Sequence, residues 1–369
     1  MLRYLNAQVK ADLARKMVFV GGPRQVGKTT LAKQVLGKAR GYLNWDDDED
    51  RAKILNRSLP TTRLWAFDEL HKYRSWRNYL KGLYDKNKGR HQILVTGSAR
   101  LDFYRFGGDS LQGRYHYLRL HPLSVAELDI QKLDDFKSLL ALGGFPEPFL
   151  TGSQTHARRW SREYRSRLIR EDLTSLERVQ DLGNLELLSL RLPELVGSPL
   201  SINALREDLR LNHATVARWI DILERLYAVF RLSPFGAPKI RAVKKEQKHY
   251  HLDWSIVPNE AARFENLVAA HLLKWVHFEQ DRAGRDVELR FFRDSDGREV
   301  DFVITEEHRP VQFVECKWND AEVSKGLRYL RNRFPTAQAW QISAIGSKDD
   351  VNSEGVRRCP AIAFLRNLI

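Results

Sequence analysis

The chain has 369 residues, of which 43% are hydrophobic and 29% are charged, so it has the composition of an ordinary folded protein of two or three domains. Its longest stretch without a charged residue, 334–347, is too short and polar to span a membrane, and no apolar signal-peptide core follows the amino terminus. The two cysteines exclude a disulfide scaffold and a cysteine-cluster zinc site. We expect a cytoplasmic protein that does not enter membranes, and the net charge of +14 favours a polyanionic partner such as nucleic acid.

Residues 1–125 alternate strand-like and helix-like segments, the pattern of a mostly parallel sheet covered by helices. An apolar run at 17–20 leads into a loop that satisfies the phosphate-binding pattern G-x-x-x-x-G-K-[ST]. Such a loop presents backbone amides to phosphate oxygens, and the following helix directs its positive end toward them. We expect Lys28 to reach the outer phosphates and Thr29 to bind magnesium. The predicted nucleotide-binding residues are Gly22, Pro23, Arg24, Gln25, Val26, Gly27, Lys28, Thr29 and Thr30.

Further ATPase motifs follow this loop in the order that an ATPase requires. An apolar strand ends in Asp68, expected to hold the magnesium shell beside Thr29, and Glu69, expected to orient and activate the attacking water. After the next strand, Thr96 or Ser98 either senses the terminal phosphate or caps a helix. Arg114, later in the chain, has two possible roles. Either it stabilises charge on the transferred phosphoryl group, in its own chain or in a neighbouring subunit, or it forms a surface ion pair.

Five motifs occur in order along the chain: Gly-Pro-Arg-Gln-Val-Gly-Lys-Thr at 22–29, Phe-Asp-Glu at 67–69, Thr-Gly-Ser at 96–98, Leu-Gln-Gly-Arg at 111–114 and Gly-Gly-Phe-Pro-Glu-Pro at 143–148. Together they resemble a bacterial and archaeal family of AAA-superfamily P-loop ATPases whose second half carries the domain DUF4143. The resemblance covers most of the chain and implies an ATPase that uses ATP and Mg²⁺.

The middle of the chain contains two candidate DNA-binding features. Residues 154–178 are predicted to be helical and very basic, and their arginines either track phosphates or form a solvated face. Two helices, at about 201–209 and 213–228, and a strand at 229–232 predict a winged helix-turn-helix. This module either enters a DNA major groove or docks a protein. The predicted DNA-reading residues are Asn212, His213, Thr215 and Arg218.

The last third begins with a basic run, Lys239, Arg241, Lys244, Lys245 and Lys248, and then contains a set of acidic residues. Glu315 and Lys317 alternate onto one face of a strand, and Asp301 lies across a predicted hairpin. Two carboxylates that bind a divalent ion, with a lysine that positions or activates water, suit metal-dependent phosphodiester hydrolysis. With the helical Glu265, these residues resemble the motif of the restriction-endonuclease-like superfamily. The resemblance leaves open whether the site cuts DNA or only holds it, and whether magnesium or manganese fills it.

We therefore expect an α/β protein of three parts. They are an AAA-type P-loop ATPase domain with a parallel sheet at 1–125, a helical and winged-helix domain at 126–238, and an α/β restriction-endonuclease-like domain at 239–369. The predicted function is ATP-dependent handling of DNA, in which nucleotide state changes DNA binding; whether the metal site at Glu265, Asp301 and Glu315 also cuts the strand is left open. One alternative is a binder of branched or four-way DNA with an idle nuclease site. Another is a nucleotide-dependent switch acting on protein partners. A homo-oligomer would let Arg114 serve a neighbouring subunit, but the sequence leaves the stoichiometry open.

Overall fold

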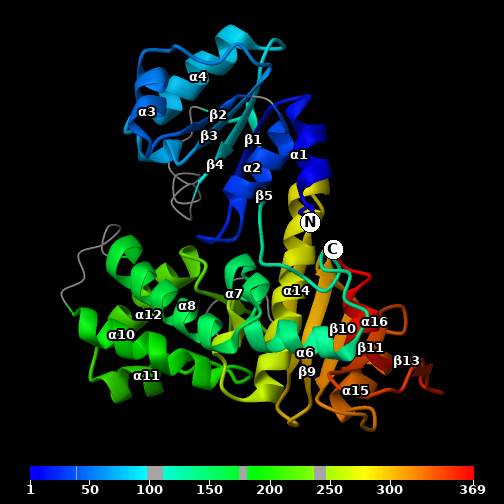
Figure 1. Ribbon diagram of the computed structural model, residues 1–369. Helices are drawn as coiled ribbons and strands as arrows, with labels where there is room; N and C mark the ends of the chain where they lie inside the picture. Colours follow the sequence, from blue (N-terminus) through cyan, green and yellow to red (C-terminus); the bar gives the residue numbers. More distant parts are fainter. Residues whose placement is uncertain (39, 98–110, 174–180, 237–246) are drawn as a thin grey trace. The chain divides into compact units, whose positions relative to one another are not determined.

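The computed structural model describes residues 1–38, 40–97, 111–173, 181–236 and 247–369 (Figure 1). The chain forms two compact units, one of Met1–Pro122 with Asp281–Ala283 and one of Leu123–Gln280 with Gly284–Ile369. The first boundary lies beside the predicted one at 125. The second unit contains both later predicted domains, which differs from the division expected at 238. Four residues of the predicted basic run (239, 241, 244 and 245), Ser98 and residues 174–178 lie outside the described ranges.

The first unit is built on a five-stranded sheet in the order β2-β3-β4-β1-β5. Every neighbouring pair in this sheet is parallel, as the alternating sequence pattern predicted. The strands are apolar runs because parallel strands are covered on both faces, and every residue of β1 is buried. The strands are β1 (Met17–Gly21), β2 (Tyr42–Asn44), β3 (Leu64–Asp68), β4 (Gln92–Thr96) and β5 (Tyr115–Arg119).

Four described α-helices accompany this sheet, and the most polar of them shows how its sequence sets its start. In α3, Asp47 accepts a hydrogen bond from the amide of Asp50, and three further acids occupy the first turn, where the helix dipole favours negative charge. The run of acidic residues therefore caps a solvated helix. The helices are α1 (Asn6–Leu13), α2 (Lys28–Leu36), α3 (Asp48–Leu55) and α4 (Trp76–Asn87), with a short 3₁₀ turn at Leu70–Lys72.

The second unit begins with helices and a two-stranded sheet. The predicted helix–turn–helix is present as α11 (Ile202–Leu209) and α12 (His213–Arg225), and α12 ends earlier than expected. After it, β6 (Val229–Leu232) pairs antiparallel with β7 (Lys248–His251), which the sequence had assigned to the next domain. The preceding helices are α6 (Leu133–Leu142), α7 (Pro146–Thr151), α8 (Gln154–Arg167), a π-helical segment (Leu168–Leu173), α10 (Leu182–Arg191) and a 3₁₀ turn (Leu192–Leu195).

A mixed six-stranded sheet in the order β12-β13-β11-β10-β9-β8 forms the rest of this unit. The predicted hairpin is β9 (Glu299–Glu306) and β10 (Arg309–Lys317). Its turn residues, Glu307 and His308, both have positive φ, as a two-residue turn of type I′ requires. The other strands are β8 (Val287–Arg293), β11 (Gln338–Ser343), β12 (Asp350–Val351) and β13 (Val356–Pro360). The helices are α14 (Glu260–Ala283), α15 (Lys325–Arg333) and α16 (Ala361–Leu365), with a 3₁₀ turn at Trp254–Ile256.

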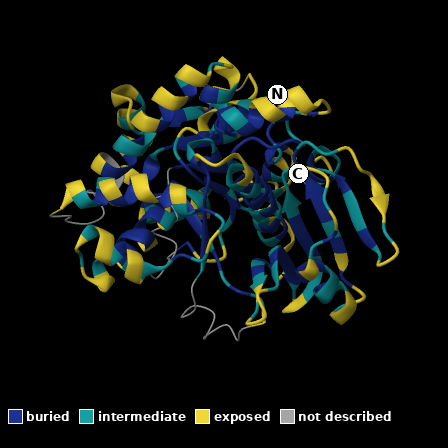
Figure 2. Ribbon diagram, turned by 90° about the horizontal axis from the view of Figure 1, so that it is seen from below, coloured by how far each residue is buried: buried dark blue, intermediate teal, exposed yellow. Residues whose placement is uncertain are grey.

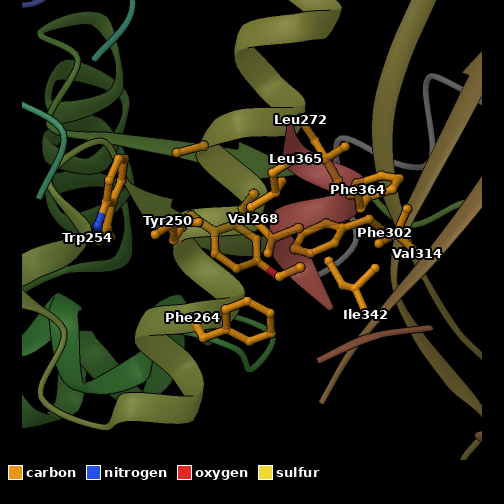
Figure 3. Close-up of a cluster of buried hydrophobic side chains, with 14 of the residues drawn as sticks. Tyr250, Trp254, Phe264, Val268, Leu272, Phe302, Val314, Ile342, Phe364 and Leu365 are labelled. Atoms are coloured by element: carbon orange, nitrogen blue, oxygen red, sulfur yellow. The ribbon is translucent and has the colours of Figure 1, made fainter. Parts of the chain in front are cut away.

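One apolar cluster explains why the two later predicted domains form a single unit. It joins Phe136 of α6 and Phe230 of β6 to Tyr250 of β7, Phe264 of α14 and Phe302 of β9. Figure 3 shows side chains of this cluster, with Tyr250 and Phe264 beside the side chains that come from the six-stranded sheet. Most strand residues are buried, and the exposed residues concentrate on helices and turns (Figure 2). Because α14 packs into a core that both regions share, they form one compact unit.

Candidate nucleotide site and carboxylate cluster

The phosphate-binding loop lies between β1 and α2, and its backbone needs glycine at two positions. Gly22 has φ +133°, and a Cβ there would lie 2.3 Å from the carbonyl oxygen of Leu120. Gly27 begins α2 with φ +99°. Lys28 is buried, and its Nζ donates to the carbonyls of Gly22 (3.0 Å) and Pro23 (2.5 Å). The loop therefore folds around the lysine that the sequence assigned to the outer phosphates.

The carboxylate of Asp68, at the end of β3, accepts three hydroxyl hydrogen bonds. The donors are Thr29 (2.7 Å) and Tyr42 (2.6 Å) to Oδ2, and Thr96 (2.6 Å) to Oδ1. Asp68 and Thr96 meet because β3 and β4 are parallel neighbours whose carboxyl ends share one edge of the sheet. Thr29 and Asp68, expected to share a magnesium ion, thus lie in direct contact. Thr96 orients Asp68, which neither sequence-based interpretation foresaw.

Tyr42 is a residue of this site that the sequence analysis missed. Burial is the largest cause that raises the pKa of its phenol, and the hydrogen bond to Asp68 acts in the same direction. The hydroxyl therefore stays a neutral donor to the carboxylate. Its signal in the sequence is weak, because a tyrosine opening a short strand, far from Asp68 along the chain, is an ordinary core residue.

Glu69 follows directly and adopts a strained backbone conformation. Its φ is +55°, which is uncommon for a residue with a side chain, and its amide donates to the carbonyl of Thr96 (3.0 Å). Burial raises the pKa of the Glu69 carboxyl, and the positive charges of Lys72 and Lys28 oppose this rise. A carboxyl with a raised pKa beside a phosphate loop is suited to take a proton from water.

Arg114 lies at the start of β5 and forms a bidentate ion pair with Asp85 of α4. Its Nε and Nη2 are 2.9 and 3.1 Å from the two carboxylate oxygens. The pair is partly exposed, so it matches the surface role considered from the sequence. A role of Arg114 at the phosphates stays a prediction.

The four predicted DNA-reading residues lie at the start of α12. Asn212 caps the helix, because its Oδ1 accepts from the amide (2.8 Å) and the hydroxyl (2.9 Å) of Thr215. His213 and Arg218 are exposed. The capping bonds give Asn212 and Thr215 a structural role at the start of the helix, and contact of the four residues with DNA stays a prediction.

The predicted residues of the last domain lie together in the second unit. Asp301 of β9 and Glu315 of β10 are linked because the amide of Asp301 donates to Glu315 Oε2 (3.4 Å). Asp301 Oδ2 accepts from the amide of Cys316 (2.8 Å), and Lys317 Nζ donates to Glu315 Oε1 (2.8 Å). Glu265 of α14 lies beside the same group, because Lys248 Nζ is 3.3 Å from Glu265 and 3.7 Å from Asp301. We call these residues, with Glu299 and Lys248, the carboxylate cluster.

Lys248 is the member of this cluster that the sequence analysis had placed in a basic run. Its Nζ lies 2.6 Å from Glu299, 3.3 Å from Glu265 and 3.7 Å from Asp301, and its side chain is 1% exposed. The hydroxyl of Tyr250, two residues along β7, donates to Glu265 (2.7 Å). The alternation Lys248, His249, Tyr250 was the available signal, because residues two apart share one face of a strand.

The cluster remains crowded with acidic groups. Burial, and then the neighbouring Asp301, raise the pKa of Glu315 to about 8 and that of Glu265 to about 7. Within the described part of the chain, no three His, Cys, Asp or Glu side chains are arranged so that they could hold a metal ion. The residues expected to bind metal there, Glu265, Asp301 and Glu315, are brought together, but not as a set of open ligands.

The parallel sheet, the phosphate loop and the Thr29–Asp68 contact define a P-loop ATPase domain. Family models agree: an AAA domain matches residues 14–129, and two domains of unknown function, DUF8612 and DUF4143, match 133–266 and 261–360. The chain therefore contains an AAA P-loop ATPase domain and a DUF4143 domain. The descriptions of the last two families name no activity. None of the helices in the described residues is long and apolar enough to cross a membrane.

Relatives and solved structures are distant. Uncharacterised proteins of Mycobacterium tuberculosis and Mycobacterium bovis are each 23% identical over 324 residues, covering 85% of this chain and 73% of theirs. A Walker-type ATPase of Pyrococcus abyssi is 15% identical with a TM-score of 0.42, covering 70% of this chain and 94% of that one. The Aeropyrum pernix ORC1 protein, solved in complex with DNA, is 16% identical with a TM-score of 0.34, covering 73% and 93%. These structural likenesses are too weak to carry an argument.

Proposed function

We propose that the first unit hydrolyses ATP and that nucleotide state controls DNA binding by the second unit. The observation that carries hydrolysis is the hydrogen-bonded group around Asp68. Oxygen ligands are those that Mg²⁺ prefers, and the Thr29 hydroxyl and Asp68 carboxylate lie 2.7 Å apart. These two residues would hold Mg²⁺, which neutralises charge on the outer phosphates.

The remaining residues of the first unit suit the steps that surround this ion. Lys28 would exchange the carbonyls of Gly22 and Pro23 for phosphate oxygens when a nucleotide binds. Glu69 would take the proton of the attacking water, and its raised pKa favours that transfer. Tyr42 and Thr96 would keep Asp68 oriented through their hydrogen bonds. Preorganised donors of this kind reduce the reorganisation that the reaction requires.

DNA is the partner that the charge and exposure of the second unit support. The chain carries a net charge of +14, and arginines on α8 are exposed at positions 158, 159, 162 and 167. His213 and Arg218 are exposed on α12, the second helix of the helix–turn–helix. In other proteins the second helix of such a motif inserts into the DNA major groove. Cationic side chains bind phosphates without regard to sequence. This supports contact with the DNA backbone rather than with particular bases.

The test is steady-state ATP hydrolysis by the full chain without DNA and with single-stranded, duplex and four-way DNA. We expect one DNA form to stimulate turnover, and we expect Lys28→Ala and Glu69→Gln to abolish it. Lys10→Ala is the control, because Lys10 is an exposed lysine on α1 of the same unit. Turnover that no DNA changes would contradict the coupling and favour a switch that acts on protein partners. Turnover that survives Lys28→Ala would contradict hydrolysis at this loop.

Metal-dependent DNA cleavage is the part of the predicted function that the geometry supports least. Its residues Asp301, Glu315 and Lys317 lie together, but every one of them is already engaged by another group of the protein. A binder of structured DNA with an idle nuclease-like site is therefore the second candidate, and the specific observation in its favour is the buried Lys248.

A further inference from the structure

We propose that the ammonium group of Lys248 occupies the position expected for a divalent metal ion in the carboxylate cluster. The second unit then holds an internal cation where a nuclease of the predicted kind would bind a metal. This inference concerns the second unit alone and does not depend on ATP hydrolysis. It assigns Lys248 as the residue that decides whether the cluster can bind metal.

The position of the ammonium group is the first argument. Lys248 Nζ lies near the carboxylates of Glu299 (2.6 Å) and Asp301 (3.7 Å) of β9 and of Glu265 (3.3 Å) of α14, so it joins two different elements. Glu265 and Asp301 are two of the three residues expected to bind metal. A divalent ion needs several such oxygens at about 2.0–2.6 Å, and it cannot share them with an ammonium group that lies within hydrogen-bonding range. The residues as placed therefore do not fit a metal ion.

Other polar groups also bond to these carboxylates. Asp301 Oδ2 accepts from the backbone amide of Cys316, and Glu265 Oε1, the oxygen that Lys248 contacts, also accepts from the hydroxyl of Tyr250. Lys317 donates to Glu315 Oε1, while Oε2 of the same residue accepts from the amide of Asp301. These bonds satisfy buried acidic groups that would otherwise be costly to desolvate. A metal ion would have to displace several of them together.

The backbone fixes Lys248 in this position. It pairs with Leu232 in the β6–β7 sheet and forms a bridge to Pro199 on its other side. The neighbouring carbonyl of Gln247 accepts from the amide of Leu200 (2.8 Å). The ammonium also lies 5.7 Å from the ring centre of Phe291. With partners on both sides of the strand and a side chain that is 1% exposed, Lys248 has no solvent-facing position to which it can move without disturbing the core.

Manganese binding by the nucleotide-free full-length protein tests the inference. In isothermal calorimetry, the wild type and Asp301→Asn should bind the same amount of Mn²⁺, because the cluster of the wild type binds none. Lys248→Met keeps the length of the side chain without its charge, and it should gain one saturable Mn²⁺ site. That site should be lost again in the double variant Lys248→Met, Asp301→Asn. The control is Lys274→Met, because Lys274 is another buried lysine of this unit, paired with Glu127, and its removal should create no Mn²⁺ site.

Two results would overturn the inference. One is an Mn²⁺ site in the wild type that Asp301→Asn abolishes, and this comparison decides the matter even if Lys248→Met fails to fold. The other is a folded Lys248→Met protein, verified by its circular dichroism, that gains no Mn²⁺ site. Neither result touches the ATPase proposal, which is tested by turnover at the phosphate loop.

Discussion

A buried lysine lies beside acidic residues in each unit, but the bonds of the two lysines differ. In the first unit, Lys28 donates to the backbone carbonyls of its own loop, and hydroxyl groups donate to the nearby carboxylate of Asp68. In the second, Lys248 is bonded to carboxylates directly. A carbonyl is a weaker partner for an ammonium group than a carboxylate is, so a phosphate can replace it at lower cost.

Because of this difference in partners, the first site can exchange its bonds for a ligand, whereas in the second site the charges of the lysines and carboxylates neutralise one another. At the phosphate loop, neutral donors hold Asp68 in place while its negative charge stays available for a cation. In the carboxylate cluster, Lys248 and Lys317 already supply cations to the acidic groups. A buried ion pair is costly to break from one side, because the remaining charge is left without a partner. We therefore expect substitutions in the first site to affect turnover and those in the second to affect stability.

The largest expected effect is that of Glu69→Gln on turnover. Loss of the proton acceptor should slow ATP hydrolysis about 10³-fold, which is about 4 kcal/mol of activation free energy, while ATP binding persists. Phosphate release and fluorescent-nucleotide binding measure the two quantities. The matched control is Glu49→Gln, an exposed acid at the start of α3. If Glu69→Gln lost stability but kept its turnover, Glu69 would have a structural role, as the residues of the carboxylate cluster do, and the prediction would be wrong.

The next effect is that of Lys248→Met on stability. Leaving several buried carboxylates without their cation should cost about 3 kcal/mol of the unfolding free energy of the second unit. Hydrogen exchange of the amides of α14 measures this quantity locally. Adding Glu265→Gln should restore part of the loss, because both sides of the pair are then neutral. Unchanged protection in the single variant would mean that the ion pairs contribute nothing to the fold.

A smaller effect is expected for Tyr42→Phe. Removing one of the three hydroxyl donors to Asp68 should cost about 1 kcal/mol, or roughly fivefold in turnover, because Thr29 and Thr96 remain. Tyr73→Phe provides the control, since this tyrosine of the same unit stacks on Trp45 with ring centres 4.9 Å apart. Equal turnover in Tyr42→Phe and wild type would show that the orientation of Asp68 does not depend on Tyr42.

The last prediction concerns pH. The folded pKa of Glu315, about 8, lies above the ordinary value of 4.5, so the folded chain keeps a proton that the unfolded chain has released between these values. The contribution of this proton to the free energy of unfolding is fully present below pH 4.5 and is lost as the pH rises through 8. Glu315→Gln should therefore flatten the fall in melting temperature over this range. If the melting temperatures of the variant and the wild type changed with pH in the same way, this result would contradict the raised pKa.

The sequence by itself determined the features that rest on local patterns. The phosphate loop follows from glycine spacing, and Asp68 was expected beside Thr29 from the order and spacing of the two motifs, which their hydrogen bond agrees with. The period of two along a strand placed Glu315 and Lys317 on one face, and the predicted hairpin put Asp301 across from them.

Only the tertiary structure decided which groups complete each site, because their partners lie far apart along the chain. Tyr42 reaches Asp68 through the pairing of β2 with β3, and Arg114 meets Asp85 across the surface of the first unit. Lys248 looked like part of a basic run until the pairing of β6 with β7 directed it into the core. Residue types predict that acids and lysines will gather, but only long-range packing determines whether a lysine faces a ligand or neutralises a carboxylate.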